Sequence, residues 1–328
     1  MTAMVFEAPG KPLGLRQMPL PRPGPRDLLI RVEACGVCRT DLHLLEGDIR
    51  PARFPIIPGH EIVGAVAGRG RLVRGFRTGD RVGVPWLGGA CGTCAWCRGR
   101  RENLCDKPVF TGLDRNGGFA EFAAADHRFC FPIPPGMDAV HAAPLLCAGL
   151  IGYRALRLAG NARRVGFHGF GAAAHILLPI ARWEGRQVYA FTRPGDRAKQ
   201  AFARRLGAAW AGNAGSRPPR PLDAVIIFAP DGSAVPEALR AVAKGGVVVC
   251  AGIHMTDIPS LPYRILWEER VLRSVANLTR ADGRDFFRIL RNIPVRPEAT
   301  SFPLAAANEA LRRLKEGKIR GAAVLTME

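Results

Sequence analysis

Four cysteines with short, regular spacing are the residues of this chain best suited to chemistry. They follow the pattern Cys-x2-Cys-x2-Cys-x7-Cys at Cys91, Cys94, Cys97 and Cys105. Four thiolates this close in sequence can surround one zinc ion tetrahedrally, and such a closed site leaves no position for a substrate. A redox Cys-x-x-Cys pair would require two thiols rather than four. The spacing therefore predicts a structural zinc site.

A second set of possible ligands lies outside this quartet. Cys38, the His60-Glu61 pair of a Gly-His-Glu sequence, and Cys147 are far apart in the chain. Two thiolates and one imidazole would leave the fourth position of a zinc ion open, as in catalytic sites. Each residue alone also has an ordinary interpretation, because a cysteine in an apolar stretch such as residues 144–148 is commonly a small core side chain. The residues by themselves leave both interpretations open.

A glycine-rich turn provides the third chemical motif. Residues 169–174 read Gly-Phe-Gly-Ala-Ala-Ala, which matches the Gly-x-Gly-x-x-Ala form of the dinucleotide fingerprint. The turn follows an apolar strand at 164–167 and precedes a predicted helix at 172–182. The amides at the start of such a helix suit a pyrophosphate. We expect Gly169, Gly171, Ala172 and Ala173 to contact the cofactor.

The elements that must position these residues change in character near residue 150. Before it, short apolar runs such as 28–32 and 62–66 alternate with proline- and glycine-rich turns. After it, apolar strands at 187–191, 222–228 and 246–251 alternate with helical segments such as 197–206. Strand–helix alternation predicts a doubly wound parallel sheet. A last helix at 306–315 and strand at 322–326 lie outside this pattern.

Composition favours a cytoplasmic protein whose partner is a small molecule. The net charge is +19, but the basic residues are scattered, so we expect neither nucleic acid nor a membrane surface as a partner. No apolar run approaches the roughly 18 residues of a membrane span, and the first ten residues do not resemble a secretory signal. Nine cysteines without an export signal favour reduced thiols or metal ligands.

Taken together, these motifs resemble the zinc-dependent alcohol dehydrogenases of the medium-chain dehydrogenase/reductase superfamily, particularly the yeast-like branch. The resemblance spans nearly the whole chain and is carried by residues 38–43, 59–64 and 143–149, the cysteine quartet and the glycine turn. It implies an α/β fold with a Rossmann doubly wound parallel sheet and a mostly-β GroES-like catalytic domain. The expected domains are 1–148, completed by 293–328, and 149–292.

The resemblance also implies roles around a catalytic zinc. Cys38, His60 and Cys147 would hold this ion, Glu61 would lie behind it as a transient ligand, and the quartet would hold a second zinc. Asp41 would orient His60, since such carboxylates fix the tautomer of a ligating imidazole.

A proton relay and a phosphate contact follow from the same resemblance. Thr40 and His43 would pass a proton between the reacting alcohol, the cofactor ribose and solvent. Arg39 matches a cofactor-phosphate contact of the family.

The segment after the predicted strand at 187–191 bears on whether the cofactor is NAD(H) or NADP(H). NAD enzymes place an acid about 20 residues after the glycine turn, but here the nearest acid, Asp196, is expected to cap the next helix. Thr192, Arg193 and Arg197 could instead contact a 2′-phosphate. We therefore expect NADP(H) in preference to NAD(H).

Trp86 matches a tryptophan that narrows the substrate pocket in the yeast-like branch, and Leu45 stands where that branch has a second, larger tryptophan. These residues predict an apolar slot for short or medium primary alcohols and aldehydes. The chain departs from the family at Ile151, which replaces a threonine beside the nicotinamide, and at Gly321-Ala322, where an arginine usually follows the glycine. These differences affect cofactor contacts and leave the zinc ligands intact.

Two alternatives remain at this stage. A zinc-independent quinone or enoyl reductase would share the scaffold but would have no use for Cys38, His60 and Cys147. A zinc-ribbon nucleic-acid-binding protein would explain the quartet and the positive charge, but not the glycine turn. The family resemblance further implies a homodimer or homotetramer.

Overall fold

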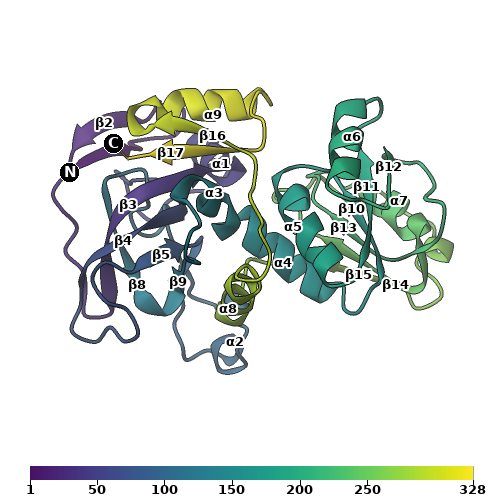
Figure 1. The fold of residues 1–328 in the computed structure, drawn as a ribbon, viewed down its shortest axis with the longest axis horizontal. Helices are drawn as coiled ribbons and strands as arrows, with labels where there is room; N and C mark the ends of the chain where they lie inside the picture. Colours follow the sequence, from purple (N-terminus) through teal and green to yellow (C-terminus); the bar gives the residue numbers. More distant parts are fainter. Residues whose placement is uncertain (328) are drawn as a thin grey trace. The chain divides into compact units, whose positions relative to one another are not determined.

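The computed structural model describes residues 1–327 and divides into two compact units. The first comprises residues 1–150 together with the segment from residue 277 onward, and the second comprises residues 151–276. The chain ends, marked N and C in Figure 1, both belong to the first unit. Within the described residues no single helix is long and apolar enough to cross a membrane. One pair of helical segments, Ala139–Leu146 and Ala148–Leu158, has the length and composition of a membrane span when the two are taken together, but the pair is bent by 45°.

A seven-stranded, mostly antiparallel sheet forms the framework of the first unit. Its strands run in the order β16-β17-β3-β4-β5-β9, and β8 pairs with β3. Strands β16 and β17 are parallel, whereas the other pairs of this sheet are antiparallel. The bounds are Asp27–Val37 (β3), Glu61–Arg69 (β4), Arg81–Val84 (β5), Phe122–Asp126 (β8), Phe131–Pro132 (β9), Ala299–Pro303 (β16) and Ala322–Thr326 (β17).

Strand β3 connects the core of this unit to the second set of predicted ligands. Leu28, Ile30, Val32 and Ala34 are buried at every second position, as expected of a strand with one face against the core. The alternation then stops, and residues 34–37 are all buried. The strand therefore carries the next residue, Cys38, to the edge of the buried interior.

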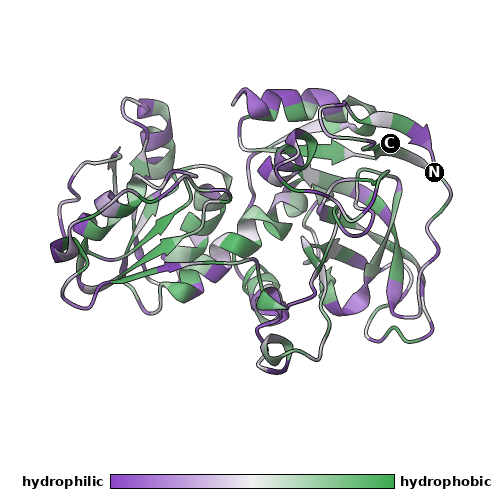
Figure 2. Ribbon diagram, turned by 180° about the vertical axis from the view of Figure 1, so that it is seen from behind, coloured by the Kyte–Doolittle hydropathy of each residue, from purple (hydrophilic) through white to green (hydrophobic). Residues whose placement is uncertain are grey.

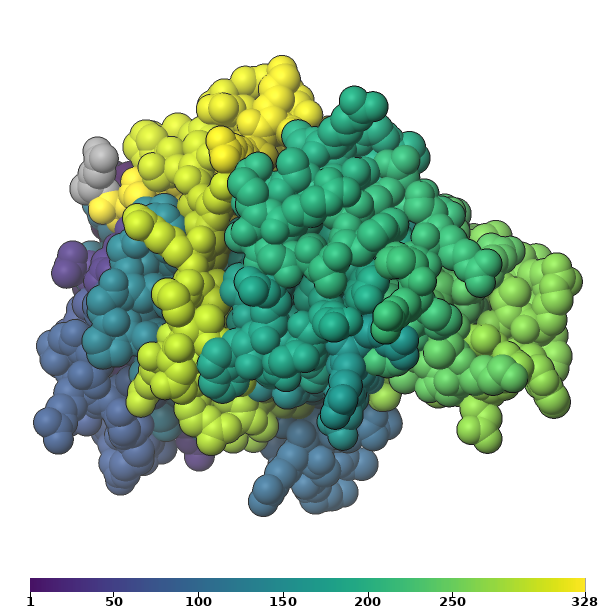
Figure 3. Space-filling model, turned by 45° about the vertical axis from the view of Figure 1, so that its right-hand side comes forward, coloured from purple at the N-terminus to yellow at the C-terminus, as the bar shows by residue number. Residues whose placement is uncertain are grey.

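Smaller elements surround this sheet. A hairpin joins β1 and β2, and β6 pairs with β7. The C-terminal helix α9 buries Ala307, Ala310 and Leu311, a spacing that places one apolar face on the core. In Figure 3 the yellow C-terminal residues lie on the surface of this unit against blue and teal residues. The bounds are Thr2–Val5 (β1), Gly14–Gln17 (β2), Leu87–Gly89 (β6), Val109–Phe110 (β7), Arg39–Glu46 (α1), Ala95–Arg98 (α2), Ala139–Ala142 (α3), Arg280–Ile289 (α8) and Ala307–Lys315 (α9), with 3-10 turns at Glu102–Leu104 (η1), His127–Phe129 (η2), Ala143–Leu146 (η3) and Leu304–Ala306 (η5).

The second unit is a six-stranded parallel sheet with helices, as the strand–helix alternation predicts. The strand order is β12-β11-β10-β13-β14-β15, so the direction of winding reverses between β10 and β13. The central strands are nearly continuous apolar runs and appear green in Figure 2, as expected of strands buried on both faces. The bounds are Arg164–His168 (β10), Gln187–Thr192 (β11), Trp210–Asn213 (β12), Leu222–Ile227 (β13), Val242–Cys250 (β14), Val271–Ser274 (β15), Ala148–Leu158 (α4), Ala172–Trp183 (α5), Arg197–Arg205 (α6), Ala234–Ala241 (α7) and Tyr263–Ile265 (η4).

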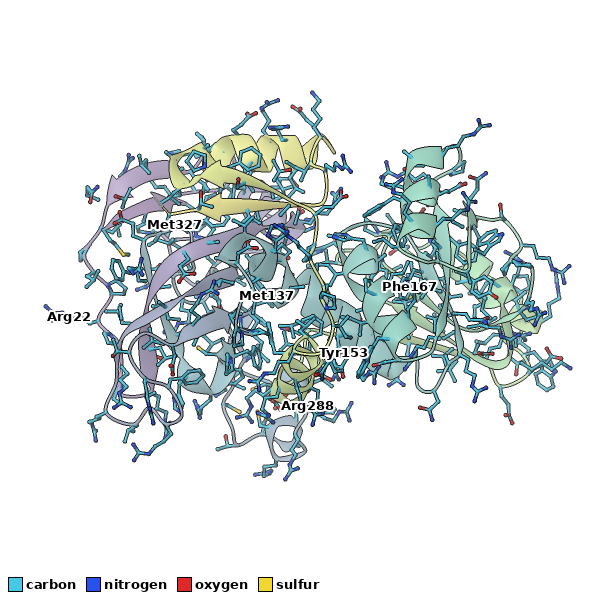
Figure 4. All side chains as sticks on the ribbon, viewed as in Figure 1. Arg22, Met137, Tyr153, Phe167, Arg288 and Met327 are labelled. Atoms are coloured by element: carbon cyan, nitrogen blue, oxygen red, sulfur yellow. The ribbon has the colours of Figure 1, made fainter. Side chains whose placement is uncertain are left out.

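Residues 277–292, expected in the nucleotide-binding domain, group with the first unit. Helix α8 buries Phe286 and Phe287, and Phe287 stacks on Phe131 of β9 at 5.7 Å between ring centroids. The backbone N and the Nε of Arg280 both donate to the carboxylate of buried Glu102, at 2.9 and 2.8 Å. By contrast Arg288, labelled in Figure 4, pairs with Asp285 on the exposed side of the same helix. The aromatic packing and the buried ion pair explain why this helix lies with the first unit.

Candidate active site

The antiparallel pairing of β3 with β4 brings Cys38 to His60. Gly36, near the end of β3, lies opposite Glu61, the first residue of β4. Cys38 follows the end of β3 and His60 precedes the start of β4, so both residues lie at the same end of this strand pair. Cys147 follows η3 directly. The Sγ of Cys38 lies 3.1 Å from Nε2 of His60 and 4.0 Å from Sγ of Cys147. One donor atom from each of these residues and from Glu61 lies within 4.8 Å of all the others.

These donor atoms fit a zinc ion. Around a tetrahedral zinc with bonds of about 2.3 Å to sulfur, two thiolates stand about 3.8 Å apart. The observed 4.0 Å between the sulfurs of Cys38 and Cys147 is close to that edge and far from the roughly 2 Å of a disulfide. Nδ1 of His60 lies 3.4 Å from the Asp41 carboxylate, which leaves Nε2 directed at Cys38. Asp41 thus lies where the family resemblance places it, behind the imidazole.

Burial sets the electrostatics of this cluster. Burial raises the pKa of Glu61 well above its usual range and also raises the pKa of Asp41, although His60 opposes the second shift. The hydrogen bond from the Cys147 thiol, assisted by His60, lowers the pKa of Cys38 well below its ordinary value. Several buried groups that can carry negative charge are costly to keep together unless a cation neutralises them. The cluster therefore has the charge as well as the geometry of a metal site.

Glu61 occupies space that Gly36 leaves open. A Cβ atom at position 36 would lie 1.8 Å from Oε2 of Glu61, so any other residue there would displace the carboxylate. Glu61 is 3% exposed. This packing keeps its carboxylate within the donor cluster.

Helix α1 begins at the cluster and carries the predicted relay residues. The side chain of Cys38 accepts from the backbone N of Thr40 at 3.3 Å, and Asp41 accepts from the backbone N of Cys38 at 2.9 Å, which forms a capping box. Thr40 and Asp41 are buried, and Arg39 is exposed. The start of this helix therefore fixes both a ligand and its supporting acid.

Asp48 was not predicted as a partner of His43. Nδ1 of His43 lies 2.7 Å from Oδ2 of Asp48, just beyond the end of α1. The signal was an acid five residues after the histidine, separated from it by Gly47, which reverses the chain at the helix end. A carboxylate at that place fixes the orientation and tautomer of the imidazole.

Trp86 lies beside the donor cluster, as predicted. Its ring meets that of His60 edge to face at 4.9 Å between centroids, and it stacks on Phe110 of β7 at 5.0 Å and 17°. Phe110 was not predicted, because only the pairing of β6 with β7 brings it to the tryptophan. Leu45 lies half-buried on α1 against the core of the first unit.

The cysteine quartet also converges. Sγ of Cys91 lies 3.9 Å from that of Cys97, and Sγ of Cys94 lies 4.0 Å from that of Cys105. One donor atom from each of the four lies within 4.8 Å of all the others. Backbone amides of Thr93 and Cys94 lower the pKa of Cys91 to about 6, whereas burial raises the pKa of Cys97 to about 12. Four sulfurs at tetrahedral spacing, supported by amides, fit a closed zinc site.

The glycine turn has the predicted form within the second unit. Gly169 has a φ of 90°, and a Cβ there would lie 2.9 Å from the backbone N of Ala229, so the turn requires glycine. Gly171 caps α5 without a side chain and is exposed. Ala172 and Ala173 follow in the first turn of this 12-residue helix. The backbone amides of this first turn have no acceptor within the helix and can therefore receive an anion.

The structure corrects one predicted cofactor contact. Thr192 is 2% exposed, and its hydroxyl lies 3.2 Å from the carbonyl of Arg193 and accepts from Nε2 of Gln200 at 3.1 Å. Because these internal partners occupy it, the hydroxyl is unavailable to a 2′-phosphate. Arg193 and Arg197 are exposed. Asp196 caps α6 by accepting from the backbone N of Lys199 at 3.0 Å, as predicted.

Comparison with known proteins agrees with this geometry. Residues 24–135 match the family model described as the alcohol dehydrogenase GroES-like domain. A Mycobacterium tuberculosis (strain CDC 1551 / Oshkosh) protein named as a probable alcohol dehydrogenase, AdhA, is 47% identical over 314 residues, covering 93% of this chain and 90% of its own. An alcohol dehydrogenase of Geobacillus stearothermophilus is 33% identical over 340 residues, covering 100% of this chain and 99% of its own. The chain belongs to the zinc-dependent alcohol dehydrogenase family of the medium-chain dehydrogenase/reductase superfamily.

A solved structure of the same family supports the fold across the chain. The cobalt- and zinc-bound thermostable alcohol dehydrogenase of Pyrobaculum aerophilum has a TM-score of 0.88 and 25% identity, and 99% of each chain is covered. The predicted fold class, a Rossmann sheet with a GroES-like domain, is confirmed. The protein is an NAD(P)-dependent alcohol dehydrogenase.

Loss of one ligand should separate the two donor clusters by metal content. We expect wild-type protein to contain two zinc ions per chain, and Cys38→Ala and Cys105→Ala each to contain about one, because each change removes one ligand from a different set. Cys105→Ala should also lower the thermal midpoint more than Cys38→Ala, since the quartet holds a loop together. Elemental analysis and calorimetry measure both effects, with Cys250→Ala as the control for losing a thiol outside the clusters. One zinc per wild-type chain would contradict the expectation.

Proposed function

We propose that this alcohol dehydrogenase interconverts short or medium primary alcohols and their aldehydes with NADP(H), using one catalytic and one structural zinc per chain. The observation that carries the proposal is the convergence of Cys38, His60 and Cys147 beside Trp86. Three protein ligands leave the fourth position for an oxygen of the substrate. The neighbouring indole supplies an apolar wall.

The chain's own residues would create the conditions for hydride transfer. Cys38, His60 and Cys147 would hold the zinc. Glu61 would lie behind these ligands, where its buried carboxylate can compensate the positive charge of the ion. Such a zinc supplies Lewis-acid polarisation of an alcohol or carbonyl oxygen, and the nicotinamide accepts or gives the hydride. Asp41 keeps the imidazole of His60 in the orientation that presents Nε2 to the cluster.

A proton must also leave this buried site when an alcohol is oxidised. We assign its transfer to the Thr40 hydroxyl and the His43 imidazole, both on α1. With its Nδ1–H donated to Asp48, His43 would take the proton on Nε2. Asp48 would thereby act through His43 as a positioning residue.

The 2′-phosphate preference rests on the turn after β11. Arg193 and Arg197 are exposed there, and Asp196 is committed to capping α6. No carboxylate within residues 192–197 is thus free to accept from a ribose 2′-hydroxyl, whereas two guanidinium groups can pair with a phosphate.

Steady-state kinetics with both cofactors tests this preference. We expect kcat/KM for NADPH to exceed that for NADH by about tenfold, which is the scale of one charge-assisted hydrogen bond. Arg193→Gln should reduce the ratio, and Arg205→Gln, at the far end of α6, should leave it unchanged. A wild-type preference for NADH would contradict the proposed cofactor.

The substrate range follows from Trp86. Because this indole packs between His60 and Phe110, its removal should open the slot beside the predicted zinc. We expect Trp86→Ala to raise kcat/KM for branched or longer alcohols relative to ethanol, with Trp183→Ala, an exposed tryptophan, as the control. Unchanged relative values across a chain-length series would show that the ring does not limit the substrate.

A homo-oligomeric, cytoplasmic enzyme is the final part of the proposal. Strand β15 forms an edge of the parallel sheet, and Val271 on this strand is exposed, as are Tyr263 and Trp267 in the segment that precedes it. Exposed apolar residues at a sheet edge favour association with another chain. None of the nine cysteines, each within the described residues, forms a disulfide, as suits a reducing compartment.

A further inference from the structure

Cys147 completes the open site that it forms with Cys38 and His60, and it lies at a break in the backbone between η3 and α4. Its φ of −121° and ψ of −75° are not those of a helix. The capping box of α1 fixes Cys38. Cys147, which follows a 3-10 turn, depends instead on the packing of the residues on either side of it.

The residues before Cys147 are held by the sheet of the first unit. Leu145 and Leu146 are both fully buried. A Cβ atom at Gly83 of β5 would lie 2.6 Å from a methyl carbon of Leu146, so this side chain packs directly on the backbone of the strand. The sheet thus fixes the chain on one side of Cys147.

The residues after Cys147 are held by Phe286 of α8. Gly149 is buried, and a Cβ atom there would lie 2.8 Å from Cζ of Phe286 and 3.4 Å from Cβ of Leu145. The side chain of Phe286 is itself fully buried, so its ring has little space to retreat. Both residues belong to the first unit. The ring of Phe286 therefore contacts the backbone two residues after a predicted ligand.

Helix α8 is itself anchored to the loop of the cysteine quartet. Glu102 lies between Cys97 and Cys105 in this loop. Its buried carboxylate accepts from the backbone N and from Nε of Arg280, the first residue of α8. A charge-assisted contact of this kind is strong and directional. The start of α8 is thus held by the quartet loop, while a later turn of the same helix holds the segment after Cys147.

We propose that Phe286 is a positioning residue for the open site. Its ring holds the backbone at Gly149 and thereby keeps the Cys147 thiolate at the position of the ion. The inference rests on the proposed catalytic zinc, and Phe286 acts through Cys147 rather than on the substrate. Because the quartet loop anchors α8, this helix also links the two donor clusters.

The metal affinity of the open site tests this role. We expect Phe286→Leu to weaken zinc at this site by about tenfold in chelator competition, the scale found when a residue that supports a metal ligand is changed. The thiolate-to-metal charge-transfer absorption of cobalt(II) in the site should also fall, since Cys147 would be bound less completely. Cys38→Ala supplies the baseline without the open site.

Phe287→Leu is the matched control for this measurement. Phe287 is buried on the same helix, but its ring stacks on Phe131 of β9. Its replacement should lower the thermal midpoint, as Phe286→Leu does, and leave the zinc affinity and the cobalt spectrum of the open site unchanged.

An exchange of size across the contact gives a second test. Gly149→Ala places a methyl group 2.8 Å from Cζ of Phe286 and should also weaken zinc at the open site. Leucine has no atom that corresponds to Cζ, so Gly149→Ala combined with Phe286→Leu should recover part of the affinity that the single changes remove. Independent effects on stability would add instead.

The link to the quartet loop is tested by Arg280→Gln. This change removes the charged partner of Glu102, and we expect it to weaken zinc at the open site by about threefold while the quartet keeps its zinc. Arg288→Gln, which breaks an exposed ion pair on the same helix, should leave the affinity unchanged.

Other results would overturn the assignment. Equal effects of Phe286→Leu and Phe287→Leu on the open site, or additive losses in the double variant, would show that Phe286 stabilises the unit without positioning Cys147; the proposed zinc would then stand. Wild-type affinity in Arg280→Gln would remove the link between the clusters. If Cys38→Ala binds as much zinc and cobalt as wild type, no open site exists, and the inference and the proposed function both fail.

Discussion

The pairing of β3 with β4 is the constraint on which the active site depends. It sets Gly36 opposite Glu61 and so places Cys38 3.1 Å from His60, although 22 residues separate them in sequence. A shift of one residue in this register would turn every side chain of the shifted strand to the other face of the sheet. The capping box at the start of α1 then fixes Cys38 and Asp41 relative to each other. Backbone hydrogen bonds, rather than the ligands themselves, thus determine where a metal can bind.

The two donor clusters apply the same chemistry with different outcomes. In the quartet, four sulfurs enclose a position from all sides, so an ion there can hold a loop but cannot meet a substrate. The other cluster has an imidazole in place of one thiolate. The absence of a side chain at Gly36 leaves room for the carboxylate of Glu61 next to these ligands. Burial makes the second cluster unfavourable without a cation, which links metal binding to the stability of the site.

Local motifs were predictable from the sequence, and contacts between distant segments were not. The quartet and the glycine turn follow from spacing alone because their residues are close in the chain. Cys147 required the family resemblance, since it lies 109 residues after Cys38. Phe110 depends on a strand pairing, Asp48 on the turn that ends α1, and the position of α8 on its packing against Phe131. Thr192 was misjudged because its hydrogen bonds to Gln200 and the backbone arise only in the folded unit.

We infer that one closed sulfur site and one open, mixed site lie in the same chain. Zinc K-edge X-ray absorption of the purified enzyme tests this claim most directly, because it counts the atoms bound to the metal. We expect an average of about three sulfurs per zinc at roughly 2.3 Å, with the remaining ligands nitrogen or oxygen at roughly 2.0–2.1 Å. Coordination by four sulfurs without nitrogen or oxygen, or by one sulfur or fewer, would contradict it.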